Sequence, residues 1–279
     1  KFEDAALEAG VALNTTGSPE ACMGVDGGDV NGDGLQDYFL TNFSEETDTL
    51  FFGEGDGFFD DNTLRSGLGK PTFDPLGFGT RLFDYDLDGD LDIYVTRGHI
   101  LDNLETLHPG TRLRYAQPDH LFQNDGKGRF TDVSESSGSW FKKKLVGRAV
   151  ATADYDSDGD LDLFIVNSGQ ECALLENRAE REGNWVGIRL QGTPPCSRDA
   201  TGSLITLKTG AGVRRVEVRS AQSYMAAGDP RVILSLDKGT AKAPPVEVRW
   251  SDGLRERFNN LQAERYHLLV RGKGEILGG

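Results

Sequence analysis

The sequence predicts an all-β protein, with a partial β-propeller of about three blades over residues 1–182 and a β-sandwich-like domain over residues 183–279. Three observations predict this organisation. An Asp-rich nonapeptide occurs three times in the first part of the chain, apolar runs of strand-forming residues follow each copy, and the balance of charge changes at about Gly183. The 279 residues also include 36 Gly and, among 45 acidic residues, 28 Asp, which favours turns over helix interiors.

The repeated nonapeptide has the pattern Asp-x-Asp/Asn-x-Asp-Gly-x-x-Asp and spans residues 29–37, 84–92 and 154–162. Ca²⁺ takes about six to eight oxygen ligands, which a tight turn with alternating carboxylates can supply. Positions 1, 3, 5 and 9 offer side-chain oxygens, position 7 a backbone carbonyl, and the glycine at position 6 permits a sharp bend. The sequence therefore predicts three calcium sites, with the ligands Asp29, Asn31, Asp33, Leu35 and Asp37; Asp84, Asp86, Asp88, Asp90 and Asp92; and Asp154, Asp156, Asp158, Asp160 and Asp162.

Two other interpretations of these loops are less well supported. An EF-hand needs a Glu at position 12, which is Leu40, Val95 or Ile165 within an apolar run, so we expect hairpin loops instead. A metal-free Asp/Gly turn is the plain alternative, but four carboxylates in one turn repel one another without a cation. Because Asn31 lowers the ligand charge, we expect weaker binding in the first loop than in the other two.

The predicted strands follow the loops in a fixed order. The first run after each loop covers residues 38–41, 93–96 and 163–166, and a second covers 50–52, 121–124 and 174–177. The first two units add a third run that begins at Phe59 or Phe130, with a glycine eight residues later. The third unit lacks this run, and Phe2, which has the same spacing to Gly10, is a candidate to complete it.

From residue 184 onward the pattern changes to alternating apolar and polar residues, which is typical of half-buried strands. The predicted strands cover residues 185–190, 203–207, 213–219, 231–236 and 246–250. Residues 1–182 carry 36 acidic and 15 basic residues, whereas 183–279 carry 9 and 15, so the acidic part is itself a candidate partner for the basic one. This acidity excludes nucleic acid as the main partner. No apolar run reaches the ~18 residues of a membrane span.

The loops and the runs after them resemble FG-GAP or VCBS-type repeats, the calcium-loop blades of integrin-type propellers. The second part resembles the ASPIC/UnbV domain over residues 184–271, through Asn184-Trp185-x-Gly187-x-Arg189-Leu190, Arg198-Asp199-Ala200-x-Gly202 and Glu247-Val248-Arg249-Trp250-x-x-Gly253. Together they resemble the carboxyl-terminal part of a cartilage-acidic-protein-like family member. The resemblance implies a calcium-binding, mainly non-catalytic protein that is secreted, extracellular or periplasmic.

Three repeats fall short of the usual ~4–8 blades of a propeller, and family members carry additional repeats. The missing blades precede Lys1 in the same precursor, or come from another chain, or the ring is partial; we favour the first interpretation.

No catalytic motif is found. Four His include no His-Glu-x-x-His pair, no Gly-x-Ser-x-Gly occurs, and the phosphate-loop-like residues 67–72 have Pro71 after the lysine. We therefore expect a protein-interaction or scaffolding module that uses loops on one propeller face or the insertion at 98–118. The alternatives are a subunit of a larger extracytoplasmic complex and an accessory factor in natural-product biosynthesis, which the UnbV name suggests.

Two smaller questions stay open at this point. Arg214, Arg215 and Arg219 form either an anion-binding patch or the solvated face of a strand. Cys172 and Cys196 form a disulfide with Cys22 left over, or all three cysteines are unpaired.

Overall fold

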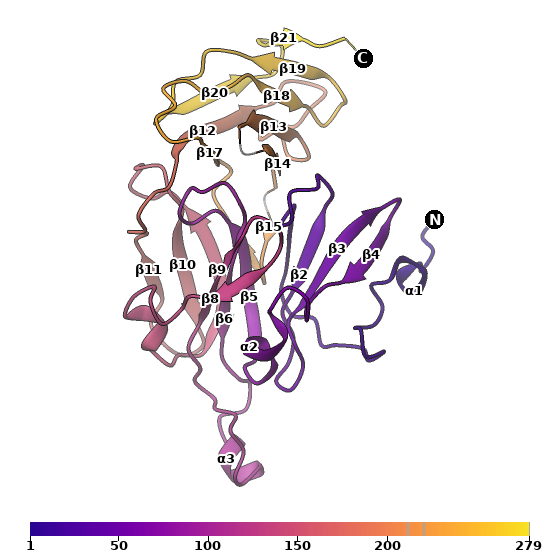
Figure 1. Cartoon of the computed structure of the whole chain (residues 1–279), viewed down its shortest axis with the longest axis vertical. Coiled ribbons are helices and arrows are strands. Elements are labelled where there is room, and N and C mark those ends of the chain that lie inside the picture. Colours follow the sequence, from indigo (N-terminus) through magenta and orange to yellow (C-terminus); the bar gives the residue numbers. More distant parts are fainter. Residues whose placement is uncertain (211, 220, 279) are drawn as a thin grey trace.

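Figure 1 shows a computed structural model of the chain, which describes residues 1–210, 212–219 and 221–278. The first part folds into three antiparallel sheets that lie side by side, which we name blades 1, 2 and 3 in chain order. Their strands are β1 (Val25–Gly28), β2 (Asp37–Leu40), β3 (Thr49–Gly55) and β4 (Phe58–Asp61); β5 (Gly77–Phe83), β6 (Asp92–Arg97), β7 (His120–Asn124) and β8 (Phe130–Asp132); and β9 (Gly147–Ala153), β10 (Asp162–Asn167) and β11 (Ala173–Leu175).

Each blade is a meander whose strand order follows the chain, and the innermost strands β1, β5 and β9 are neighbours. The strands of blade 2 are apolar because this blade packs against a neighbouring blade on each of its two faces. All residues of β6 are buried, because Ile93 and Val95 pack against blade 1 while Tyr94, on the other face of the strand, packs against blade 3. The predicted all-β class and propeller-type blades are confirmed.

Among the described residues, helical structure is limited to α1 (Ala6–Ala9), α2 (Gly69–Phe73), α3 (Leu104–Leu107) and one 3₁₀ turn at Trp140–Lys142. The helix α1 packs beside β4 of blade 1, not beside blade 3. Residues 1–5 form no strand, and Phe2 is fully exposed.

The suggestion that Phe2 completes blade 3 is therefore wrong. Its spacing to Gly10 nevertheless has a structural basis: Gly10 lies against the carbonyl of Phe59, and Gly67 lies in the same way against Phe130. The segment from Phe59 to Gly67 leads from blade 1 into blade 2. The segment from Phe2 to Gly10 leads in the same way into blade 1.

The second part contains two sheets that share one core. The first sheet has the order β17-β12-β20 and the second β14-β13-β18-β19-β21. Their strands are β12 (Asn184–Gln191), β13 (Leu204–Thr209), β14 (Gly212–Glu217), β17 (Val232–Leu236), β18 (Val246–Arg249), β19 (Arg255–Phe258), β20 (Tyr266–Val270) and β21 (Glu275–Ile276). The core between the sheets includes Val186, Ile205, Val246 and Trp250, all at most 1% exposed. The sandwich-like prediction is thus confirmed.

A short hairpin of the second part reaches back into the propeller. It consists of β15 (Ala221–Gln222) and β16 (Ala226–Ala227). Its turn touches the innermost strands of two blades: Ser223 forms a bridge with Val25 of β1 and accepts a hydrogen bond from the Thr80 backbone of β5 (3.0 Å), and the Tyr224 ring packs edge-on against Phe78. The hairpin thus joins the two parts of the chain near the propeller centre.

The connection between β11 and β12 covers residues 176–183, and the predicted boundary falls within it. All three cysteines are free in the structure, with Cys22 and Cys172 exposed and Cys196 buried, which answers the question of a disulfide in favour of unpaired thiols. Within the described residues, no helix has both the length and the apolar character that crossing a bilayer requires.

Candidate metal centres

Each Asp-rich nonapeptide forms the hairpin loop between the first and second strands of a blade. Loop 1 (29–37) joins β1 to β2, loop 2 (84–92) joins β5 to β6, and loop 3 (154–162) joins β9 to β10. Equivalent loops of adjacent blades lie at the same face of the propeller, which here is the face toward the second part of the chain (Figure 1). The structure therefore groups the predicted ligands into three neighbouring clusters.

Loop 2 has a carboxylate cluster with several unpartnered oxygens. One carboxylate oxygen from each of Asp84, Asp86 and Asp88 lies within 4.8 Å of the others. One Oδ1 atom each of Asp84, Asp86 and Asp90 is buried without a hydrogen-bond partner. Buried acceptors without partners are costly, and a hard cation bound between Asp84, Asp86 and Asp88 would supply a positive partner to this group. The residues of loop 2 therefore fit a divalent cation.

Loop 3 has a similar cluster with partial compensation by an arginine. Carboxylate oxygens of Asp154, Asp156 and Asp162 lie within 4.8 Å of one another, and Oδ1 of Asp160 is buried without a partner. Arg181 forms ion pairs with Asp158 (2.7 Å) and with the other oxygen of Asp160 (2.8 Å). Two of the five predicted residues thus already face a positive charge.

Loop 1 differs in the spacing of its carboxylates and not in its internal hydrogen bonds, because the position-1 Asp accepts from the position-6 glycine in all three loops. Asp29 accepts hydrogen bonds from the backbone of Gly32 and Gly34, both at 2.8 Å. Asp33 accepts one from the Leu35 backbone (2.7 Å) and one from the Asn31 amide (2.9 Å). In the described part of the chain, loop 1 shows no group of three carboxylates as close as those of loops 2 and 3. The lower charge at Asn31 and the wider spacing of the carboxylates both fit the prediction of weaker binding at loop 1.

The position-9 aspartate has the same second task in every loop, which sequence reasoning missed. Asp37 accepts backbone hydrogen bonds from Val30 and Gly53, at 2.8 and 2.9 Å. Asp92 and Asp162 make the equivalent pairs, with Tyr85 and Asn124, and with Tyr155 and Asn177. Each carboxylate therefore ties its loop to the end of the blade's third strand. The remaining lone pairs of this carboxylate are free to coordinate a cation.

The electrostatics of the loops are unfavourable without a cation. Burial, reinforced by the charges of Asp86 and Asp88, raises the pKa of Asp84 to about 7, although hydrogen bonding from Ser235 opposes the shift. Burial likewise raises the pKa of Asp92 to about 9 and that of Asp37 to about 6. Raised carboxyl pKa values mean that the fully charged loop is destabilised, and a bound cation would reverse this.

Comparison with known proteins agrees with this geometry. Residues 29–95 and 112–165 match the model of the FG-GAP-like repeat, and residues 192–276 match that of ASPIC and UnbV. The chain carries FG-GAP-like repeats followed by an ASPIC/UnbV domain. It is similar to human and mouse cartilage acidic protein 1, at 32% and 30% identity over 166 residues, or 60% of this chain. Those residues cover 21% and 22% of the two relatives, so the match spans about a fifth of their length.

The ASPIC/UnbV domain covers the same position of all three FG-GAP-like loops. The position-6 glycines have φ values of +87°, +98° and +102°. A Cβ atom on Gly34 would lie 2.2 Å from Arg215, one on Gly89 would lie 1.9 Å from Arg214, and one on Gly159 would lie 1.8 Å from the Trp185 ring. The glycine is therefore needed for the turn in all three loops, and in loop 3 also for the close approach of the Trp185 ring.

The two interpretations of Arg214, Arg215 and Arg219 are both too simple, because the three side chains face the propeller. Arg219 forms an ion pair with the buried Asp26 of β1 (3.2 Å) and donates to the Gly27 carbonyl (2.7 Å). The charge difference between the two parts of the sequence pointed to such a contact. Loop 3 is held by Tyr266, whose hydroxyl donates to Asp154, and by Arg231, which donates to the Asp154 carbonyl at 2.6 Å.

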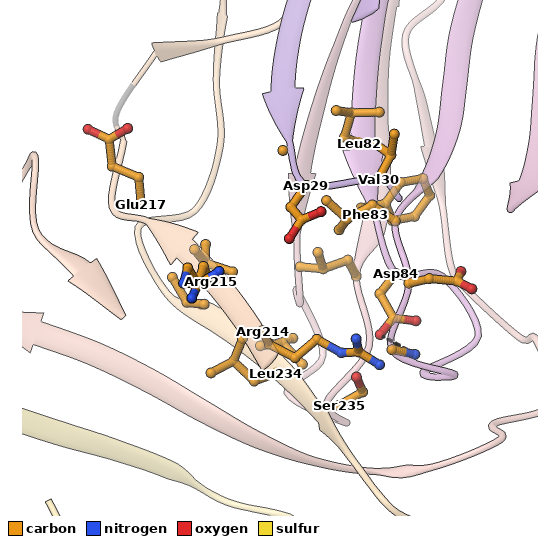
Figure 2. A pocket seen from close by; sticks show the side chains of 18 of the residues that line it. Asp29, Val30, Leu82, Phe83, Asp84, Arg214, Arg215, Glu217, Leu234 and Ser235 are labelled. Atoms are coloured by element: carbon orange, nitrogen blue, oxygen red, sulfur yellow. Dashed lines mark hydrogen bonds between the residues drawn. The ribbon is translucent and has the colours of Figure 1, made fainter. Parts of the chain in front are cut away.

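A cavity of about 550 Å³ lies between loops 1 and 2 and the ASPIC/UnbV domain (Figure 2). Asp29 and Asp84 line its propeller side, and Arg214, Arg215 and Ser235 line the opposite side. Its walls thus carry charges of both signs, with the acidic groups on one domain and the basic groups on the other.

Proposed function

We propose that this protein is an extracytoplasmic, calcium-binding, non-catalytic module for protein interaction or scaffolding. The observation that carries the calcium part is the set of unpartnered buried carboxylate oxygens in loops that occur at the same place in consecutive blades. Bound Ca²⁺ would stabilise the folded state by mass action, by about 2.7 kcal/mol per site at a hundredfold excess over Kd. The extracytoplasmic location rests on the similarity to cartilage acidic protein 1.

The calcium proposal is tested by melting the full chain after removal of metal, with and without added CaCl₂. We expect Ca²⁺ to raise the midpoint of the wild-type protein, and the gain to shrink in Asp86→Asn, which alters an unpartnered ligand of loop 2. Asp102→Asn is the matched control, because Asp102 is an exposed carboxylate of the insertion. An unchanged wild-type midpoint would refute the proposal.

The interaction part is directed to the insertion at 98–118. The ASPIC/UnbV domain covers part of the loop face of the propeller, which leaves less of that face to a partner. The insertion, with α3, projects from the opposite end of the molecule (Figure 1). Ile100 and Leu107 are 54% and 52% exposed there, which gives a partner apolar side chains to contact. Loss of partner binding in Ile100→Asp/Leu107→Asp, with unchanged melting, is the expected result for a partner once isolated.

The non-catalytic part is supported by the state of the histidines. Burial and the nearby Arg97 lower the pKa of His120 to about 3, and the His99 ring accepts a hydrogen bond from the Leu101 backbone (3.0 Å). Burial also lowers the pKa of His99, so these two rings are poor proton acceptors.

One observation favours a subunit of a larger assembly as the second candidate. Phe164, Val166 and Leu174, on the face of blade 3 away from blade 2, are 46%, 38% and 51% exposed. We name them the blade 3 row. Contiguous exposed apolar residues are typical of interfaces, and blades of the same precursor or of another chain would cover this face. The native mass of the intact particle tests this.

A further inference from the structure

Strand β14 places two consecutive arginines on two different FG-GAP-like loops. It is the edge strand of its sheet, and neighbouring residues of a strand point to opposite faces. Arg214 is paired in register with Leu207, and Arg215 with Thr206. Arg214 therefore reaches Gly89 of loop 2, while Arg215 reaches Gly34 of loop 1. The β14 edge is thus inserted between the two loops.

Neither arginine forms an ion pair with a loop carboxylate. Arg215 donates one hydrogen bond, to the Gly34 carbonyl at 3.3 Å. Arg214 has no hydrogen-bond or ion-pair partner within the described residues, and its Nε atom is buried. Two positive charges are therefore held against the loops by the fold of the second domain. They act on the carboxylates through the electric field, and each lowers the pKa of the nearby Asp84 or Asp29 against the larger effect of burial.

We infer that Arg214 and Arg215 are built-in counter-cations of loops 2 and 1, which compete with Ca²⁺ and couple metal binding to docking of the ASPIC/UnbV domain. This inference rests on the proposed calcium binding. A divalent cation among the carboxylates repels a guanidinium next to the same loop. Thermodynamic linkage is reciprocal. Ca²⁺ bound at loops 1 and 2 therefore weakens the arginine contacts, and it does so by the same factor by which the arginine contacts weaken Ca²⁺ binding.

Loop 3 provides an internal comparison. Its position-6 glycine is covered by the neutral Trp185, its ion pairs come from Arg181 in the connection, and Arg231 before β17 donates to the Asp154 carbonyl. Substitutions in β14 therefore change the counter-charge of loops 1 and 2 and leave that of loop 3 intact. Only part of the calcium binding should respond to them.

Calorimetric titration of the metal-free full chain with CaCl₂ tests the inference. We expect Arg214→Gln/Arg215→Gln to bind Ca²⁺ more tightly than wild type, by about fivefold for each affected site, the scale of the repulsion between a monovalent and a divalent cation about 8 Å apart in a water-like dielectric. The charge-preserving pair Arg214→Lys/Arg215→Lys should stay near wild type. Arg189→Gln/Arg249→Gln is the matched control, because both arginines are exposed on strands of the same domain.

A second measurement reports on docking. Hydrogen exchange of the β14 amides should be faster with Ca²⁺ than without it in wild type, and less responsive to Ca²⁺ in the glutamine pair. If the double variant fails to fold, Arg215→Gln alone, at an exposed position, gives the same comparison for loop 1.

The outcomes separate the two proposals. Equal or weaker Ca²⁺ affinity in the glutamine pair, with binding intact in wild type, overturns the counter-cation inference and leaves calcium binding in place. Absence of binding in wild type overturns both.

Discussion

At the scale of single residues, the position-6 glycines show two constraints at once. The repeat pattern indicated that this glycine permits a bend, and the positive φ values agree with that. The second constraint, contact with Arg215, Arg214 or Trp185, depends on a domain far away in the sequence. No local pattern could have revealed it, although Trp185 lies in a motif that had already been singled out.

Gly159→Ala separates these two constraints. The new methyl group meets both a left-handed backbone (φ +102°) and the Trp185 ring at 1.8 Å. Gly253→Ala is the control, because Gly253 has φ +91° and no heavy atom within 4 Å of its Cβ position. We expect a loss of about 1–2 kcal/mol in the control from backbone strain alone, and about 2 kcal/mol more in Gly159→Ala. Urea denaturation measures both, and equal losses would contradict the contact.

The loop carboxylates also set a pH dependence for the metal-free protein. Burial raises the pKa of Asp84 from 3.8 to about 7 in the folded state. The folded protein then binds more protons than the unfolded chain between these values, so this contribution is complete below about pH 4 and is lost as pH rises through about 7. We expect the melting point of the metal-free protein to fall between about pH 5 and pH 8, and added Ca²⁺ to reduce the fall. Asp84→Asn should flatten the curve; an identical slope would count against the assignment.

At the scale of elements, the sequence predicted the strands that have a strong local apolar pattern. It did not predict the strands that form because of tertiary packing. The runs at 93–96 and 163–166 correspond to β6 (Asp92–Arg97) and β10 (Asp162–Asn167). The innermost strands β1, β5 and β9 had no such run. They are rich in small residues because the strands approach closely: a Cβ on Gly79 of β5 would lie 2.8 Å from the Val150 backbone of β9. Strand propensity is low for such residues, so packing between the blades, and not the local sequence, determines that these segments are strands.

The hairpin of β15 and β16 is a further element that the sequence did not indicate, and its role can be measured. Tyr224 packs against Phe78 with ring centroids 5.2 Å apart, whereas the next residue, Met225, is 88% exposed. We expect Tyr224→Ala to lose about 1–2 kcal/mol and to increase tryptic cleavage at Arg178 in the connection, because the domains separate more readily. Met225→Ala should change neither. Equal cleavage of the two variants would show that the hairpin does not hold the domains together.

At the scale of the whole molecule, the uneven charge has a structural explanation. The acidic part presents its Asp loops on one face, and the basic part places Arg214, Arg215, Arg219 and Arg231 against that face. Composition predicted two parts of opposite charge and allowed for contact between them. It could not predict which arginines make the contact, because the β14 edge acquires its position from the sandwich fold. The carboxylate clusters of loops 2 and 3 lie within the predicted loops, whereas the lack of such a cluster in loop 1, among the described residues, depends on side-chain orientations that spacing does not fix.

The blade 3 row gives a prediction for the particle in solution. Phe164 and Leu174 are cross-strand partners in β10 and β11, so they form one continuous apolar area rather than two isolated residues. We expect the chain to self-associate with increasing concentration in sedimentation velocity, and Phe164→Ser/Leu174→Ser to reduce this without lowering the melting point. Leu7→Ser/Leu64→Ser is the control, because these leucines are 77% and 65% exposed but lie apart from the row. An equal effect of both variants would indicate that general surface hydrophobicity, and not this face, drives the association.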